Sequence, residues 1–167
     1  MPAELTPAEL TPANHRRACI FTLARSRFAL DVEVITTISS ISPWRRLPAT
    51  AAAVLGAMPH PRRPQALAVI DLAALLELPD ETVAPTAERT VLLVELPRLS
   101  CALHVKQVLA VSRLDGVQRT GGDEPAWVAG YLPQSGADPA SVIDAATLGH
   151  LLAALRCVRD DRLSLTA

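Results

Sequence analysis

The sequence predicts an all-β protein built from two similar, small β-barrel units, and two observations support this prediction. Short apolar stretches that alternate like β-strands follow one another at close intervals, separated by polar or proline-containing links. The sequence also repeats itself at a fixed offset of 73 positions, as expected for two related structural units in one chain. A parallel α/β sheet would need a long crossover helix between strands, and the sequence predicts only two short helices.

The repeat is clearest at two aspartates. The tripeptide Val69-Ile70-Asp71 recurs 73 positions later as Val142-Ile143-Asp144. At the same offset Leu23, Arg25, Ala29, Leu30 and Val32 match Leu96, Arg98, Ala102, Leu103 and Val105. Chance identity among alanine, leucine and valine is the alternative explanation. The shared offset favours two structurally equivalent halves.

In the first half, local patterns predict a hairpin, a β-branched stretch, an irregular connection, and a strand followed by a helix. The hairpin joins residues 19–23 to 27–32, and β-branched residues continue to 41. The alanine-rich stretch 49–56 predicts one helical turn or a compact loop ending at Gly56, and three prolines predict a loop over 58–65. A buried strand over 67–70 then ends at Asp71, which caps a short helix that stops at Pro79.

The second half predicts the same succession. Strands are expected at 91–96, 99–105 and 108–111, and after a surface loop over 115–125 at 127–132 and 141–143. Asp144 then caps a final helix over 145–155, as Asp71 caps the first. This equivalence predicts two structural caps rather than a pair of catalytic carboxylates.

These patterns divide the chain into one folded region and two tails. Residues 1–17, in which Pro-Ala-Glu-Leu-Thr occurs twice, predict a flexible tail, with transient helix or partner contact as the alternative. The folded region covers 18–155, with halves at about 18–79 and 91–155 joined by the polar segment 80–90. Residues 156–167 are expected to form a loosely held tail.

Composition limits the classes of function. Half of the 167 residues are apolar, and a formal net charge of -1 gives no general attraction to nucleic acid or to an anionic membrane. No apolar run approaches the roughly 18 residues of a membrane span, and the chain does not begin with a signal-peptide pattern. We therefore expect a cytoplasmic protein that does not insert into the membrane. Five aromatic residues are too few for the stacking platforms of single-stranded nucleic-acid binders.

No pattern predicts catalysis, a cofactor or a metal site. Cys19, Cys101 and Cys157 are scattered within apolar runs and are expected to be small buried side chains. The four histidines contain no pair at the i, i+4 spacing that would hold a metal. His104 aligns with Asp31 in the repeat, and a surface or edge position is expected for it. The sequence also lacks a nucleophile elbow and a glycine-rich phosphate loop.

Trp44 lies among arginines that suggest a protein-binding surface. Arg45 and Arg46 follow it directly, and Arg62 and Arg63 lie in the proline-containing stretch. Because Trp and Arg are over-represented at the centres of interfaces, a protein-binding rim with an aromatic anchor is one interpretation. A solubilising role for two separate arginine pairs is the other, and few further basic residues support nucleic-acid binding.

The order of these pieces resembles the CheW-like family, the coupling proteins of bacterial chemosensory arrays. The resemblance covers about residues 18–155. The stretches that carry it, in order, are Phe21–Leu23 with Phe28–Val32, Val54–Gly56, Val69–Leu72 with Leu75 and Leu78–Pro79, Val91–Val111, Trp127–Gly130 and Val142–Asp144. It implies two five-stranded SH3-like barrels side by side with a groove between them, with short helices and a C-terminal helix. It also implies a protein without catalytic activity or cofactor.

The resemblance further implies three kinds of partner: the regulatory domain of a chemosensory histidine kinase, the cytoplasmic tip of methyl-accepting chemoreceptors, and other CheW-like copies. The expected function is an adaptor that couples receptors to the kinase in chemotaxis or pilus-type motility signalling and reaches the membrane through receptor arrays. A CheW-like scaffold that binds kinase or other copies without receptors is one alternative. A small-molecule-binding or catalytic β-barrel is the other.

Two departures from the family pattern fall on the expected partner surface. Where the family has Asn-Leu-Arg-Gly after Gly56, this chain has the longer stretch 58–65, so Arg62 or Arg63 replaces the family's contact arginine or the contact is lost. The family's usual glutamate is Thr37 here.

Seven residues are candidates for protein binding by their position. Ile35 and Thr37 are expected near the groove that would receive a receptor helix, since an amphipathic helix in an apolar groove is a common binding mode. The other candidates are Trp44, Arg62, Arg63, Leu99 and Val108.

Overall fold

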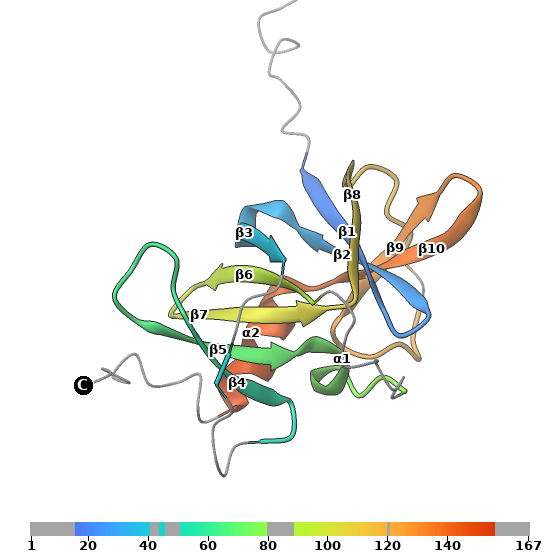
Figure 1. The fold of residues 1–167 in the computed structure, drawn as a ribbon. Helices are drawn as coiled ribbons and strands as arrows, with labels where there is room; N and C mark the ends of the chain where they lie inside the picture. Colours follow the sequence, from blue (N-terminus) through green and yellow to red (C-terminus); the bar gives the residue numbers. More distant parts are fainter. Residues whose placement is uncertain (1–15, 41–43, 46–50, 80–88, 120, 156–167) are drawn as a thin grey trace, which may run out of the picture.

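The computed structural model describes residues 16–40, 44–45, 51–79, 89–119 and 121–155, which form two five-stranded sheets and three short helices (Figure 1). In spatial order, sheet A contains β8 (Gln107–Arg113), β1 (Arg17–Leu23), β2 (Ser26–Asp31), β10 (Ala137–Ile143) and β9 (Val128–Gln134). Sheet B contains β3 (Ile35–Ser40), β6 (Thr90–Leu96), β7 (Leu99–Val105), β5 (Ala66–Asp71) and β4 (Val54–Pro59). The prediction of an all-β protein with two five-stranded units is confirmed.

The two sheets do not follow the two halves of the sequence. Sheet A combines β1 and β2 of the first half with β8, β9 and β10 of the second. Sheet B combines β3, β4 and β5 of the first half with β6 and β7 of the second. A parallel pair joins the halves in each sheet, through Ala29 and Val142 in sheet A and through Val69 and Ala102 in sheet B. The two pairs are equivalent in the repeat, because Ala29 corresponds to Ala102 and Val69 to Val142 at the offset of 73. The expected halves, about 18–79 and 91–155, are therefore equivalent, but each supplies strands to both sheets.

Each sheet is closed into a barrel by a bridge between its two edges. In sheet B, Arg45 follows the edge strand β3 and exchanges two backbone hydrogen bonds of 2.8 Å with Ala57 of β4. In sheet A, Gln118 follows β8 and makes the same pair, again at 2.8 Å, with Tyr131 of β9. The approach is close, because a Cβ atom at Gly56 would lie 2.1 Å from the Arg45 carbonyl oxygen. Glycine is thus required beside the bridge.

The stretch around Gly56 differs from its expected structure. Gly56 lies inside β4 rather than at the end of a helical turn or loop, and Met58 and Pro59 belong to the same strand, so only 60–65 form the loop. The alanine-rich composition favours a helix locally. Pairing with β5 and the bridge to Arg45 require extended backbone, and this tertiary pairing overrides the local propensity.

Both repeat aspartates cap helices, as predicted. Asp71 Oδ1 accepts hydrogen bonds from the backbone N–H groups of Ala73 (3.1 Å) and Ala74 (3.4 Å) at the start of α1 (Leu72–Leu75). Asp144 Oδ2 accepts from the N–H (2.9 Å) and the hydroxyl (2.6 Å) of Thr147 at the start of α2 (Ala145–Ala154). Each carboxylate satisfies N–H donors that the first turn of a helix leaves unpaired.

One apolar cluster connects the two barrels. It contains Phe21 and Leu30 from sheet A and Leu92 and Leu103 from sheet B, and all four side chains are fully buried. Helix α2 adds Leu148 and Leu152 to the same cluster, and Figure 1 shows this helix beside sheet B. Each barrel also has a smaller core of its own, around Ile20 and Leu132 in sheet A and around Val69 and Leu93 in sheet B, so the shared cluster joins two units that each have an apolar interior.

Cys19 and Cys101 are buried, as predicted, and burial raises the pKa of the Cys19 thiol. Cys157 and the two expected tails lie outside the described residues, apart from Arg16 and Arg17, where β1 begins. Most of the expected linker 80–90 also lies outside them. Among the described helices, none has the length and apolar character needed to cross a membrane.

Candidate protein-binding surface

The junction of the two barrels exposes part of their shared core. The 3-10 helix η2 (Val32–Val34) contacts β1 of sheet A and both β3 and β6 of sheet B, so it lies between the barrels. Next to it in sequence, Ile35 begins β3 and packs half-buried against the core cluster. Val108 of β8 packs half-buried against the same cluster from sheet A. We call Val34, Ile35 and Val108 the junction residues.

The two edge strands beside the junction carry exposed apolar side chains. Ile38 of β3 is 44% exposed, and Val111 of β8 is 54% exposed. The repeat offset relates these two positions, and Leu109, on β8 as well, is 38% exposed. Within the described residues, no strand pairs with the outer edge of β3 or of β8. An edge strand with free backbone groups and apolar side chains favours contact with another protein.

Thr37 lies in a small cleft beside the arginine-containing loop. The cleft has a volume of about 260 Å³ and is lined by Thr37, Met58, His60 and Leu93, among others. The Arg62 N–H donates to His60 Nδ1 at 3.0 Å.

Both arginines of this loop are exposed, and Arg63 also makes an ion pair of 3.0 Å with Glu95 of β6. Because Glu95 follows Val94, the partner of Ile35 in the sheet, the ion pair brings Arg63 to the part of sheet B that contains Ile35. The structure thus brings Thr37 and the loop arginines to one face of sheet B, whereas Ile35 and its partner Val94 pack on the other face, against the core that the barrels share.

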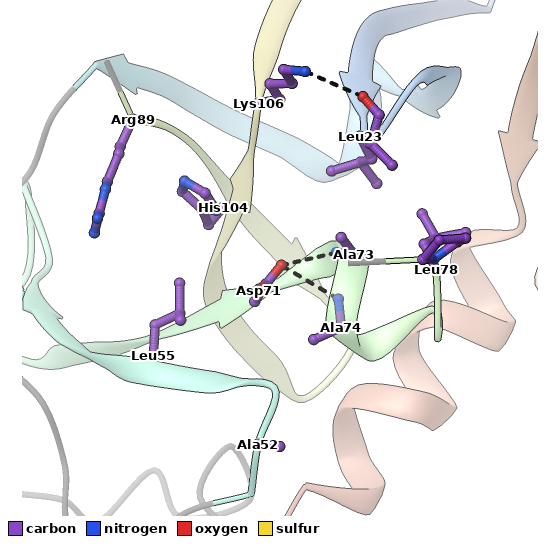
Figure 2. A pocket seen from close by; sticks show the side chains of 12 residues that line it. Leu23, Ala52, Leu55, Asp71, Ala73, Ala74, Leu78, Arg89, His104 and Lys106 are labelled. Atoms are coloured by element: carbon purple, nitrogen blue, oxygen red, sulfur yellow. Dashed lines mark hydrogen bonds between the residues drawn. The ribbon is translucent and has the colours of Figure 1, made fainter. Parts of the chain in front are cut away.

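A second cavity lies where the hairpin turn of sheet A meets sheet B. Its volume is about 460 Å³, and its lining includes Leu23, Leu55, Leu78 and four polar side chains: Asp71, Arg89, His104 and Lys106 (Figure 2). We call it the His104 cavity. A neighbouring cavity of about 350 Å³ shares Leu23, Ala24, Leu78 and Pro79 with it. The two together form a groove between the barrels.

Trp44 belongs to the wall of sheet B rather than to an exposed rim. Its ring packs half-buried against the core, and the ring centroid lies 6.1 Å from that of His104 in an edge-on arrangement. The Arg89 Cζ atom lies 4.8 Å from the Trp44 ring centroid, within the range of a cation–π contact. Trp44 therefore positions Arg89 and His104 beside the cavity.

The expected position of His104 is wrong. It lies on β7, the central strand of sheet B, and its side chain is half-buried. Burial and the charge of Arg89 lower the pKa of His104, and this lowering exceeds the opposing effect of the Asp71 carboxylate. The imidazole is therefore neutral at pH 7. Within the residues that the structure describes, no group of three His, Cys, Asp or Glu side chains is arranged to hold a metal ion.

Leu99 is a core residue rather than a contact residue. It begins β7, is 9% exposed and belongs to the apolar cluster that joins the barrels. The strand start suggested a surface position, but the neighbouring hairpin residue Leu96 turns inward with it. Both side chains pack into the core, so Leu99 offers little area to a partner.

Sequence reasoning overlooked the exposed residues Leu109 and Val111 and the polar groups of the His104 cavity. The repeat offers a signal for Val111, because the offset relates it to Ile38 on the other edge strand. No sequence signal identifies the cavity, whose lining comes from distant segments that only the fold assembles.

Comparison with known proteins identifies relatives of this chain. A family model described as a CheW-like domain matches residues 17–150. The crystal structure of the scaffolding protein TtCheW from Thermoanaerobacter tengcongensis is similar over 78% of this chain and 89% of that chain, with a TM-score of 0.64 and 18% sequence identity. A search of curated protein sequences found no match. Because the family model covers most of the chain, the protein belongs to the CheW-like family.

Proposed function

We propose that this protein is a non-enzymatic cytoplasmic adaptor that couples chemoreceptor tips to the regulatory domain of a chemosensory histidine kinase. Family membership supports a scaffold of chemotaxis signalling. The observation that carries the proposal further is the pair of exposed apolar residues, Ile38 and Val111, at equivalent places on two unpaired edge strands. An adaptor needs more than one protein-binding surface, and the repeat supplies two.

We assign kinase binding to these edge strands. Their exposed aliphatic side chains lose contact with water when a partner covers them, and a fully buried side chain of this size contributes about 1.5–3 kcal/mol. The free backbone groups of the edges add hydrogen bonds to a partner strand. The same surfaces suit binding of other CheW-like copies.

We assign receptor binding to the junction residues. Val34, Ile35 and Val108 are partly buried on the shared core, and a ridge of apolar side chains from an amphipathic helix would complete their burial. Thr37 and the arginine-containing loop line one cleft, and Thr37 and the loop arginines would contact the polar face of such a helix. The proposal covers chemotaxis and pilus-type motility signalling alike.

Calorimetric titration with the regulatory domain of the kinase from the same cell tests the kinase assignment. We expect Ile38→Asp or Val111→Asp to weaken binding by about tenfold or more, since a charge replaces a buried aliphatic contact. Ser40→Asp on β3 and Gln107→Asp on β8 are matched controls, because both positions are exposed and polar. If none of the four substitutions weakens binding, the edge strands are not part of the interface. If the wild-type protein does not bind the kinase domain at high micromolar concentration, kinase coupling is excluded.

A soluble fragment of the receptor tip tests the second assignment. We expect it to bind the wild-type protein, and charge reversal of Arg62 and Arg63 to weaken this binding. Substitution of Val108 by Asp should abolish it while circular dichroism reports an intact fold. Kinase binding without any receptor binding would instead support the alternative of a scaffold that does not couple receptors.

A further inference from the structure

We propose that the His104 cavity binds a small aliphatic monocarboxylate, with Arg89 as the main anion-binding group. The inference is independent of the adaptor function, because it follows from a comparison of the two barrels within this chain. In one barrel an arginine binds a carboxylate of the chain itself. In the other barrel, the equivalent carboxylate is replaced.

The barrel of sheet A shows what an arginine at this place does. Arg16 Nε donates to Asp31 Oδ2 at 2.9 Å, and Arg16 Nη2 donates to the same oxygen. Asp31 is only 6% exposed, and its Oδ1 accepts the Glu33 N–H at 2.9 Å. The fold thus places an arginine just before the first strand of the repeat unit so that it holds a buried carboxylate at the end of the second strand.

In sheet B, His104 occupies the position of that carboxylate. Val91 pairs with His104 in β6 and β7 as Ala18 pairs with Asp31 in β1 and β2, and Arg89 stands where Arg16 stands. Within the described residues, no carboxylate makes an ion pair with Arg89, and its Cζ atom lies 4.8 Å from the centroid of the Trp44 ring instead. A guanidinium carries five N–H donors, more than a contact with one aromatic ring can use, so donors are left for a ligand oxygen.

The cavity beside Arg89 has the size and lining of a small-molecule site. Its volume of about 460 Å³ lies within the range of roughly 300–1,000 Å³ that is usual for ligand pockets. Leu23, Leu55 and Leu78 line it with aliphatic surface that suits a short hydrocarbon chain. An anionic head and an apolar tail therefore both find complementary groups.

The charges of the lining favour one negative charge on the ligand. Among the described residues that line the cavity, Arg89 and Lys106 are cationic, Asp71 is anionic and His104 is neutral, and Lys106 Nζ already donates to the Ala24 carbonyl oxygen at 3.4 Å, so Arg89 is the main group for an anion. Asp71 already accepts two backbone N–H groups at the start of α1 and disfavours a second anion close to it. The neutral imidazole of His104 can donate one N–H to the carboxylate beside Arg89.

Calorimetric titration of the full chain with hexanoate tests the proposal, with hexanamide as the neutral ligand of matched shape. We expect saturable binding of hexanoate and much weaker binding of hexanamide. N-acetylglutamate α-amide presents the same carboxylate on a peptide-like side chain, and the proposal requires hexanoate to bind more tightly. Equal affinity for hexanoate and hexanamide, preference for the glutamate compound, or no saturable binding at millimolar concentration would each overturn the site.

Two variants test the role of Arg89. Arg89→Ala should weaken hexanoate binding by about 10- to 100-fold, the range of a charged hydrogen bond, whereas Arg62→Ala on the exposed loop should have no effect. His104→Asp restores the arginine–carboxylate pair of the other barrel, so the fold should persist while the internal carboxylate displaces hexanoate.

Nuclear magnetic resonance gives a readout that does not depend on affinity. Hexanoate should raise the pKa of His104, because a carboxylate beside the imidazole stabilises its protonated form, and should leave the imidazole resonances of His60 in place. Undiminished hexanoate binding by folded His104→Asp, or a pKa of His104 that hexanoate does not change, would show that the carboxylate does not bind at this place.

Discussion

Gly56 lies directly against the carbonyl group of Arg45, and this contact closes the barrel of sheet B. Two backbone hydrogen bonds of 2.8 Å join Arg45 to Ala57, the neighbour of Gly56 on β4. A Cβ atom at Gly56 would lie 2.1 Å from the Arg45 carbonyl oxygen and 2.9 Å from the Trp44 ring. Backbone atoms cannot move away without breaking the bridge, so the bridge depends on the missing side chain.

Substitution of Gly56 by alanine should therefore lower the free energy of unfolding by about 2–3 kcal/mol, because the new methyl group forces backbone displacement in a packed region. Gly149→Ala in α2 is the matched control. Its added Cβ would meet only Leu96 Cδ1 at 3.8 Å, and alanine in a helix interior gains up to about 1 kcal/mol over glycine. Urea denaturation measures both effects, and similar stability of Gly56→Ala and wild type would contradict the proposed role of the contact.

The cap of α2 predicts a specific dependence of stability on pH. Hydrogen bonds from the Thr147 hydroxyl and backbone N–H lower the pKa of Asp144 below its ordinary value of 3.8, against a smaller opposite effect of burial. A carboxyl group whose pKa is lower in the folded state stabilises the fold fully above its unfolded pKa. This contribution is lost as the pH falls below 3.8 through the lower folded pKa.

Comparison with Asp144→Asn isolates this contribution, since asparagine also caps helices but does not titrate there. We expect the stability difference between wild type and Asp144→Asn to be constant from about pH 5 to 7 and to shift against the wild type below about pH 4. Unfolding curves of both proteins at a series of pH values measure it. Parallel curves down to pH 2 would show that Asp144 has the same pKa in the folded and unfolded chains.

The exchange of strands between halves predicts that neither half folds alone as a monomer. A fragment of residues 1–84 would contain β1 to β5 without the strands that complete either sheet. A fragment of residues 85–167 would contain β6 to β10 and would lack β1 to β5. Mixing the fragments should restore a 1:1 complex with the near-ultraviolet circular dichroism of the intact chain. Because the halves are equivalent, a homodimer of one half is also compatible with the topology, whereas a folded monomer of residues 1–84 would contradict it.

Local chemistry identified the strands and both helix caps. The hairpin of β1 and β2, the strand before Asp71 and the helix after Asp144 all follow from short-range patterns of apolar and capping residues. The segment of β4 does not, because the alanine-rich stretch that leads into it favours a helix, and only the pairing with β5 and the bridge to Arg45 make it extended. The buried position of Leu99 also escaped prediction, since a strand end has the same local pattern whether it faces solvent or core.

The candidate site was predicted less well than the fold. Thr37 and the altered loop were both expected on the partner surface, and the structure brings Thr37 into a cleft with the loop and links Arg63 to β6. Their role in binding remains a proposal. The His104 cavity had no sequence signature, because Asp71, Arg89 and His104 belong to three separate segments and converge only when β5 and β7 pair in parallel.

The sequence by itself determined the equivalence of the two halves, since the repeat places the same apolar, turn and capping residues at the same offset. It did not determine which half completes which barrel. A strand exposes the same hydrogen-bonding groups to a partner from its own half as to the equivalent partner from the other half, so local pattern cannot choose between them. Only the tertiary structure made that choice, by pairing β2 with β10 and β5 with β7 around one shared apolar cluster.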